Sequence, residues 1–207
     1  MINHIIMIKI GYQLLNSNRL IEENIKSLIK ILEELKDHKE PIENLFKIAL
    51  KVIKKNKKII FCGNGGSAAE AQHFATELVV RFKKNRKALP SLSLTTDTSA
   101  ITAIGNDFSF NKIFSRQLEA LGNKGDLLIL LSTSGNSKNL IEAVKSANKN
   151  KIQTFSLIGK GGGYLKKISE NYIVINSNDT ARIQEVQLMI GHLLCNYLER
   201  MYQTSKL

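Results

Sequence analysis

Two stretches rich in Gly and Ser are the segments of this 207-residue chain best suited to chemistry. They read Gly63-Asn64-Gly65-Gly66-Ser67 and Ser132-Thr133-Ser134-Gly135-Asn136-Ser137. Each follows a short apolar run and leads into a stretch with helical spacing. Such residues usually form turns and helix caps. However, glycines let a backbone approach an anion closely, and N–H groups at a helix start favour phosphate. Two such loops at equivalent places therefore predict a phosphate site, with the Ser and Thr hydroxyls as further donors.

The kind of phosphate follows from what the two loops lack. Gly63-x-Gly65-x-x-Ala68 matches the dinucleotide fingerprint, but that motif needs an acidic residue about 20 positions later. Asp97 lies well beyond that distance, and no Gly-Lys-Ser/Thr follows to complete a nucleoside triphosphate loop. A phosphate monoester on a small metabolite is the better candidate.

Acid–base groups occur on the helix expected after the first loop and on the last helix of the chain. His73 and Glu77 are four residues apart, a spacing that puts both on one helix face. Gln184, Glu185 and His192 lie on the final helical stretch. A solvated His–Glu pair and a buried structural His are the alternative interpretations. A cluster of His, Glu and a second His would suit proton transfer, or a zinc site with an open position.

The elements that must position these residues alternate along the chain. The β-rich apolar runs cover residues 58–62, 91–95, 127–131, 154–158 and 172–175, and the helical patterns cover residues 20–35, 41–54, 68–82, 111–121, 140–148 and 180–202. Strands separated by helices indicate parallel pairing with right-handed crossovers. We therefore predict the α/β class: one doubly wound domain with a five-stranded parallel sheet and an N-terminal helical pair. Residues 1–56 are expected to form an N-terminal helical segment of that domain, and residues 57–207 its phosphosugar-binding part.

Composition bounds the possible partners. The net charge of +12 comes mostly from Lys dispersed in pairs, which favours a solvated basic surface over a nucleic-acid site. Two cysteines are too few for a disulfide framework and indicate buried free thiols in a reducing compartment. Residues 1–12 are apolar but contain Lys9 and are too short to span a membrane. We expect a soluble, cytoplasmic protein with no membrane or nucleic-acid partner.

A family resemblance covers nearly the whole chain from about Leu20. It rests on Phe61-Cys-Gly-Asn-Gly-Gly-Ser67, Gln72-His73-Phe74, Glu77, Arg81-Phe82, Leu94-Thr-Thr-Asp97, Gly105-Asn106-Asp107, Phe114-Ser-Arg-Gln117, Ser132-Thr-Ser-Gly-Asn-Ser137 and Arg182-Ile-Gln-Glu185. These motifs closely resemble the bacterial phosphoheptose isomerases of the sugar isomerase (SIS) superfamily. The resemblance implies interconversion of sedoheptulose 7-phosphate and D-glycero-D-manno-heptose 7-phosphate, the first step toward the ADP-heptose of lipopolysaccharide core. It also implies a homotetramer with active sites between subunits.

The resemblance assigns roles by position. Glu77 would be the base that moves a proton between C1 and C2 through an enediol, and His192 the complementary acid. The implied ligands of one zinc ion per subunit are His73, Glu77, Gln184 and His192. The implied substrate-binding residues are Asn64, Gly65, Gly66, Ser67, Arg81, Asn106, Asp107, Ser132, Thr133, Ser134, Ser137 and Gln184, with the Ser and Thr hydroxyls on the phosphate.

Three features of the sequence complicate that assignment: one spacing and two residue differences. Gln184 and His192 are eight residues apart, about 12 Å along a regular helix, so both reach one ion only across subunits or from an irregular helix start. The intersubunit site implied by the resemblance fits the first option. Gln187 stands where many relatives carry His, and Ala181 replaces an Asp found in some members. Both departures bear on substrate contacts.

Three rival functions remain at the level of sequence. A superfamily relative that binds the replication initiator lacks the catalytic carboxylate and histidine, whereas Glu77 and His192 are present here. Phosphosugar-sensing regulators usually carry an added DNA-binding domain, and no recognition-helix signature precedes the expected sheet. Other phosphosugar chemistry on the same domain, such as amino-sugar phosphate isomerisation or lactyl-ether cleavage, stays open.

Overall fold

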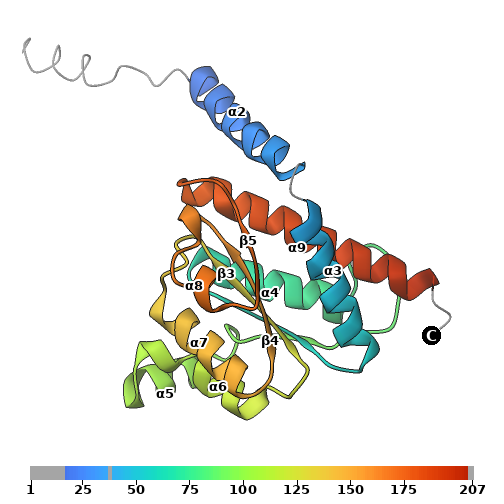
Figure 1. Cartoon of the computed structure of the whole chain (residues 1–207), viewed down its shortest axis with the longest axis vertical. Coiled ribbons are helices and arrows are strands. Elements are labelled where there is room, and N and C mark those ends of the chain that lie inside the picture. Colours follow the sequence, from blue (N-terminus) through green and yellow to red (C-terminus); the bar gives the residue numbers. More distant parts are fainter. Residues whose placement is uncertain (1–16, 37–38, 205–207) are drawn as a thin grey trace, which may run out of the picture. The chain divides into compact units, whose positions relative to one another are not determined.

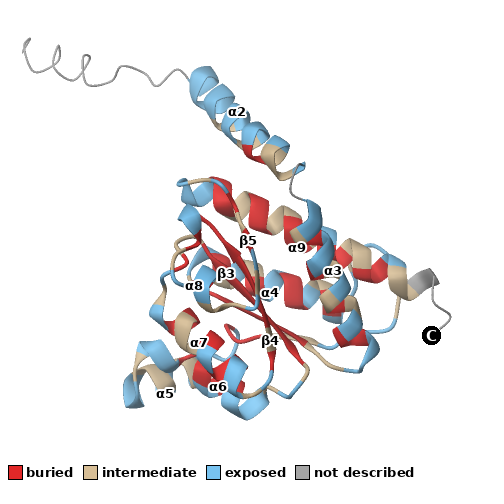
Figure 2. Cartoon of the chain, viewed as in Figure 1, coloured by how far each residue is buried: buried red, intermediate tan, exposed pale blue. Residues whose placement is uncertain are grey.

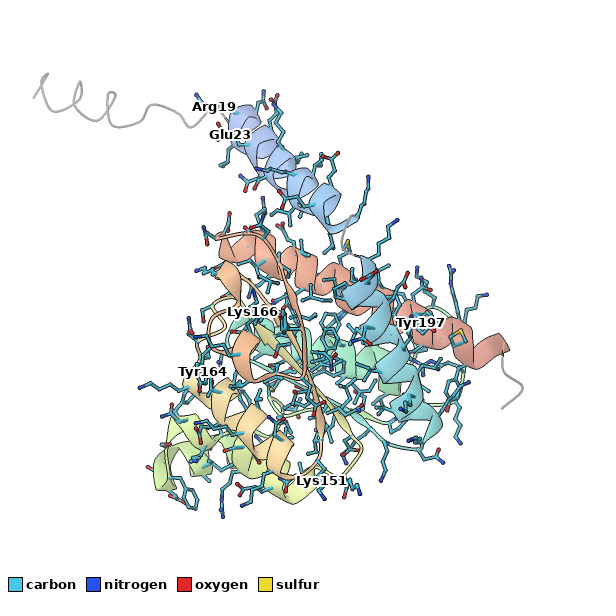
Figure 3. The ribbon with its side chains drawn as sticks, viewed as in Figure 1. Arg19, Glu23, Lys151, Tyr164, Lys166 and Tyr197 are labelled. Atoms are coloured by element: carbon cyan, nitrogen blue, oxygen red, sulfur yellow. The ribbon has the colours of Figure 1, made fainter. Side chains whose placement is uncertain are left out.

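The computed structural model describes residues 17–36 and 39–204 and divides into two units, Met1–Asp37 and His38–Leu207 (Figure 1). The first unit contributes helix α2 (Ser17–Lys36), close to the predicted range. Its exposed side carries ion pairs at i,i+4 spacing, of which Arg19–Glu23 is labelled in Figure 3. The extension at residues 1–12 lies outside the described residues, and the boundary at residue 56 stays a prediction.

The second unit is built on a five-stranded sheet. Its strands are β1 (Ile59–Gly63), β2 (Ser91–Ser93), β3 (Leu127–Ser132), β4 (Gln153–Ile158) and β5 (Asn171–Val174). All neighbours pair in parallel in the order β2-β1-β3-β4-β5, which confirms the predicted fold class. The register places Gly63 beside Leu131, so the Gly-rich and Ser-rich loops leave the sheet side by side.

Helices cover both faces of the sheet. They are α3 (Lys39–Lys54), α4 (Gly66–Val79), α5 (Thr98–Asp107), α6 (Ser115–Leu121), α7 (Lys138–Lys149), α8 (Leu165–Ile168) and α9 (Thr180–Thr204). Strands β1 and β3 are buried along their whole length between these layers, which is why they read as continuous apolar runs (Figure 2). On one face, Phe61 of β1 contacts Phe74 of α4. On the other, α6 and α7 join a core cluster with Ile60 and Leu128.

Helix α9 is supported from the side by α3. Phe46 of α3 stacks on Tyr197 of α9 with ring centroids 4.8 Å apart, and Figure 3 shows Tyr197 beside α3. This contact lies near the C-terminal half of α9, the helix that carries His192.

Some elements differ from the predicted ranges. The helix expected over residues 111–121 is a short turn (Phe110–Lys112) followed by α6, and the strand expected over 91–95 ends at Ser93. Helix α5 was not predicted, because it has no buried residue and so no strong apolar periodicity. Its start depends on a local interaction instead, since Asp97 caps it by accepting a hydrogen bond from the Ala100 N–H.

Both cysteines are buried and unpaired, as predicted. Burial raises the pKa of the Cys195 thiol to about 12 and also raises that of Cys62, so neither thiol is a reactive thiolate near neutral pH. No helix among the described residues is both long enough and apolar enough to cross a membrane.

A buried ion pair connects two strands at the end of the sheet opposite the loops. Asp126 is 1% exposed and lies 2.6 Å from the Lys58 ammonium. Its Oδ1 accepts a hydrogen bond from the Lys58 N–H and its Oδ2 accepts one from the Asn123 N–H. Asp126 therefore joins the start of β3 to the start of β1.

Asp126→Asn should lower the free energy of unfolding by about 2 to 3 kcal/mol, because the amide removes the buried charge and one acceptor oxygen. Urea unfolding followed by circular dichroism measures this loss. An unchanged midpoint would show that the pair contributes nothing to stability.

Candidate active site

A cavity of about 200 Å³ lies at the carboxyl ends of β1 and β3. It is lined by Asn64, Gly66, Ser67, Leu131, Ser132, Thr133, Ser137, Leu140, Thr180 and Gln184. The first turns of α4, α7 and α9 all contribute to this lining, and a helix start carries unpaired N–H groups and a partial positive charge. The N-cap residues of α4 and α7, Gly65 and Ser137, make no side-chain capping hydrogen bond. The cavity is therefore suited to an anion the size of a phosphate group.

The two loops around this cavity hold each other in place. The Asn64 and Asn139 side-chain amides exchange two hydrogen bonds, of 2.9 and 2.7 Å, and so connect the first loop to α7. Ser132 Oγ accepts a hydrogen bond from the Gly135 N–H, which closes the second loop on itself. These hydrogen bonds order the second loop before an anion binds, so binding costs little conformational entropy.

A third segment supports the Ser-rich loop from outside. Tyr164 N–H donates to Asn136 Oδ1 and Leu165 N–H donates to the Gly135 carbonyl, both at 2.9 Å. Tyr164 is labelled in Figure 3. Of the residues predicted for the phosphate, Ser67, Ser132, Thr133 and Ser137 line the cavity. Gly65 and Ser134 lie on the loops but outside the cavity lining, and Ser134 Oγ accepts from the Asn136 N–H.

A second group of polar side chains lies farther along α4 and α9. His73 Nε2 is 2.7 Å from His192 Nε2, although the two residues are 119 positions apart. His73 Nε2 is also 3.7 Å from Glu77 Oε1, on the same face of α4. The structure thus brings together His73, Glu77 and His192, two imidazoles and one carboxylate that can exchange protons.

The surroundings of His192 favour its neutral form. Burial lowers the pKa of His192, and the neighbouring His73 and Lys83 lower it further, while Glu77 opposes the shift. The rings of Phe74 and Phe82 lie 6.2 and 5.5 Å from the imidazole. His192 still reaches solvent through a second cavity of about 340 Å³. A neutral imidazole can exchange a proton with a substrate oxygen or bind a metal ion.

Gln184 lies apart from this cluster. Helix α9 is continuous from Thr180 to Thr204, and Gln184 Nε2 lies 3.4 Å from Ser67 Oγ at the cavity beside the ends of β1 and β3. The donor atoms of His73, Glu77 and His192 are of the kinds that zinc binds, namely imidazole nitrogen and carboxylate oxygen. Within residues 17–36 and 39–204, however, no group of three or more His, Cys, Asp or Glu side chains is arranged as a metal site.

Besides Gly65 and Ser134, three more predicted substrate-binding residues line neither cavity. Arg81 is exposed just beyond α4 and donates to Asn85 Oδ1. Asn106 and Asp107 are exposed at the end of α5 and hydrogen-bond to each other at 2.9 Å. Their roles stay predictions.

The structure also reveals residues of this region that the sequence analysis did not select. Glu70 shares the face of α4 with His73 and Glu77, and burial raises the pKa of its carboxyl group to about 7, although a hydrogen bond with Ser67 opposes the shift. The spacing of these three residues at i, i+3 and i+7 could have identified it. Gln187 is fully buried and donates to the Leu157 carbonyl at 2.7 Å, so it joins α9 to β4. That burial gives Gln187 a role in packing within this chain.

Comparison with known proteins agrees with this geometry. The model of the SIS domain family matches residues 23–159. A phosphoheptose isomerase from Nitratiruptor sp. is 48% identical over 87% of this chain and 95% of its own length. The chain belongs to the phosphoheptose isomerases of the SIS-domain family. A Campylobacter jejuni member is 49% identical over 87% of this chain and 97% of its own. The solved phosphoheptose isomerase from Neisseria gonorrhoeae superposes with a TM-score of 0.84 at 37% identity, over 89% of this chain and all of that one.

In this phosphoheptose isomerase family member, α4 and α9 are in close contact at Gly191. A Cβ atom added there would lie 2.1 Å from the ring of Phe74, which is itself 1% exposed and has no room to move. Only glycine therefore lets the two helices approach closely enough for the imidazoles of His73 and His192 to meet.

Gly191→Ala should lower the free energy of unfolding by about 1 to 3 kcal/mol, because the added methyl group overpacks the contact. Gly105→Ala is the matched control: it also lies in a helix but meets nothing within 4 Å, and it should leave stability equal or raise it by up to about 1 kcal/mol. Urea unfolding of both variants measures the difference. Equal stability of the two would contradict the close contact.

Proposed function

We propose that this chain interconverts sedoheptulose 7-phosphate and D-glycero-D-manno-heptose 7-phosphate. The observation that carries the proposal is the division of the site into two parts on the same two helices. The cavity at the starts of α4, α7 and α9 takes the phosphate group, and the cluster of His73, Glu77 and His192 acts on the other end of a sugar.

The reaction moves one carbon-bound proton and redistributes the oxygen-bound ones. Glu77 removes a proton from C1 of the ketose, and His192 donates a proton to the carbonyl oxygen at C2, which gives a neutral enediol. His192 then takes the proton from the hydroxyl at C1 while Glu77 returns a proton to C2, which gives the aldose. Binding at the distant phosphate holds C1 and C2 in place during both transfers.

We further propose that His73, Glu77 and His192, together with Gln184, hold a zinc ion. When bound, zinc would supply Lewis-acid polarisation of the substrate carbonyl. The support is the convergence of two imidazole nitrogens and the nearby carboxylate. Because Gln184 lies at the phosphate cavity of its own chain, the fourth ligand is proposed to come from another subunit.

A homotetramer with shared sites is the assembly we propose. Leu20, Ile21, Ile25 and Ile29 form an apolar stripe on α2, and each is about half exposed. Leu193 is exposed on α9 beside His192 and lines the same cavity. Contiguous exposed apolar residues of this kind mark protein interfaces. From the resemblance alone, we also propose that the enzyme acts in the cytoplasm and that its product supplies ADP-heptose for lipopolysaccharide core.

Glu77→Gln should abolish turnover while leaving binding of the sugar phosphate detectable, because the amide keeps the shape of the side chain but accepts no proton. The measurement follows sedoheptulose 7-phosphate and its aldose product by NMR, with calorimetry for binding. Near-normal turnover by this variant would remove Glu77 as the base.

The same assay separates the proposed function from its rivals. Formation of the aldoheptose phosphate by the unaltered protein supports the isomerase. No product from an intact oligomer would favour a non-catalytic SIS protein or another phosphosugar. Added zinc should raise the rate of chelator-treated protein, and an unchanged rate would remove zinc from the proposal.

A further inference from the structure

A buried carboxylate on α9 binds the segment that follows α4. Glu199 is 3% exposed, and its two oxygens accept hydrogen bonds of 3.0 to 3.2 Å from three consecutive N–H groups, those of Phe82, Lys83 and Lys84. These three residues lie outside any helix or strand. Since charged acceptors form the stronger hydrogen bonds, Glu199 is the main constraint on this segment.

Arg86 extends the connection to the end of α4. Its side chain is also 3% exposed, and its Nε lies 3.7 Å from Glu199 Oε2. Its Nη2 donates to the Glu77 carbonyl at 2.7 Å and its Nη1 to the Leu78 carbonyl at 2.8 Å. Carbonyls in the last turn of a helix have no partner within the helix. Arg86 therefore fixes the turn of α4 from which the Glu77 side chain extends.

The segment bound by Glu199 also contacts His192, which is the proposed acid of the proton-transfer pair. The Phe82 ring lies 5.5 Å from the His192 ring, and the Lys83 ammonium lies 5.0 Å from the Phe82 ring. His192 and Glu199 are seven residues apart and so share one face of α9. One buried pair is thus joined by direct contacts to the backbone of Glu77 and, through Phe82, to the imidazole of His192.

The ion pair of Glu199 and Arg86 is the last of three contacts along α4 and α9, which run parallel and in register. Gly66 lies against Gln184 at the phosphate cavity, and Phe74 lies against Gly191 midway along. Glu199 makes the third connection, beyond the cluster of Glu77 and His192. Without it, the ends of α4 and α9 that follow the midway contact lose the hydrogen bonds of Glu199, whereas the contacts at the phosphate end stay intact.

We propose that Glu199 and Arg86 are positioning residues that set the separation of Glu77 and His192 for proton transfer. The inference rests on the proposed function. It assigns the pair an effect on the chemical step and not on substrate affinity, because the phosphate cavity lies at the opposite ends of the two helices.

Glu199→Gln tests this directly, because the amide keeps the volume but loses the charge and one acceptor oxygen. We expect kcat to fall about tenfold or more, with KM within about twofold of the unaltered protein, since small misplacements of reacting groups cost rate. Arg86→Lys keeps the charge but loses the paired hydrogen bonds to two carbonyls. It should likewise lower kcat with little change in KM. It serves as the second variant if Glu199→Gln folds poorly.

Asp126→Asn is the matched control. It removes another buried carboxylate that accepts backbone N–H groups and pairs with a cation, but at the far edge of the sheet. The Asp126→Asn protein should be less stable than the unaltered protein, with an unchanged kcat. If its kcat falls as far as that of Glu199→Gln, the effect is general destabilisation and the proposal is wrong. A Glu199→Gln protein with unchanged kcat, or with a raised KM alone, overturns it equally.

Two readouts do not need turnover and so separate this inference from the proposed function. Hydrogen–deuterium exchange of a peptide covering residues 81–87 should be faster in Glu199→Gln, and the nuclear Overhauser contact between the Phe82 and His192 rings should weaken. If the unaltered protein is inactive on sedoheptulose 7-phosphate, the proposed function fails and these two readouts decide the positioning role. Unchanged exchange and an unchanged ring contact would overturn it.

Discussion

The close parallel contact of α4 with α9 is the constraint on which the rest of the site depends. The two helices leave the sheet from different parts of the chain, and Gly191 lets them touch at the ring of Phe74. Because they run in register, one end of the pair faces the cavity proposed to bind phosphate, and the imidazoles of His73 and His192 meet beside the midway contact. A shift of one helix by a single turn, about 5 Å, would separate the imidazoles and remove Gln184 from the cavity.

The sheet supplies the second half of the arrangement. Parallel pairing of β1 with β3 brings two loops to one edge, and three helices begin there. Their N–H groups and dipoles provide positive potential, so a cavity that has no Lys or Arg among its lining residues is still suited to a phosphate group. An anionic group can therefore bind at the helix starts, where it is held away from the acid–base cluster.

Sequence reasoning predicted those features whose causes are local. Gly65 and Ser67 follow a buried strand and Ser137 precedes a helix, so residue type and order were enough to predict the two loops and the helix starts that follow them. The i,i+4 spacing of His73 and Glu77 likewise indicated a shared face. The contact between His73 and His192 depends on how two distant helices pack, and it was expected only through resemblance to the phosphoheptose isomerases. Glu199 gave no signal, because its partners are backbone N–H groups, which every sequence contains. Helix α5 was missed because its start depends on one capping carboxylate.

In the proposed mechanism, Glu77 carries hydrogen from C1 to C2 as a proton, and no hydrogen shifts directly between the two carbons. The most direct measurement incubates sedoheptulose 7-phosphate with the protein in deuterium oxide for many turnovers and locates deuterium in the product by NMR. Proton transfer by Glu77 predicts deuterium at C2 of the aldoheptose phosphate, because the proton held by Glu77 exchanges with solvent. A product whose C2 carries the hydrogen from C1 of the substrate, and no deuterium, after many turnovers would contradict proton transfer by Glu77.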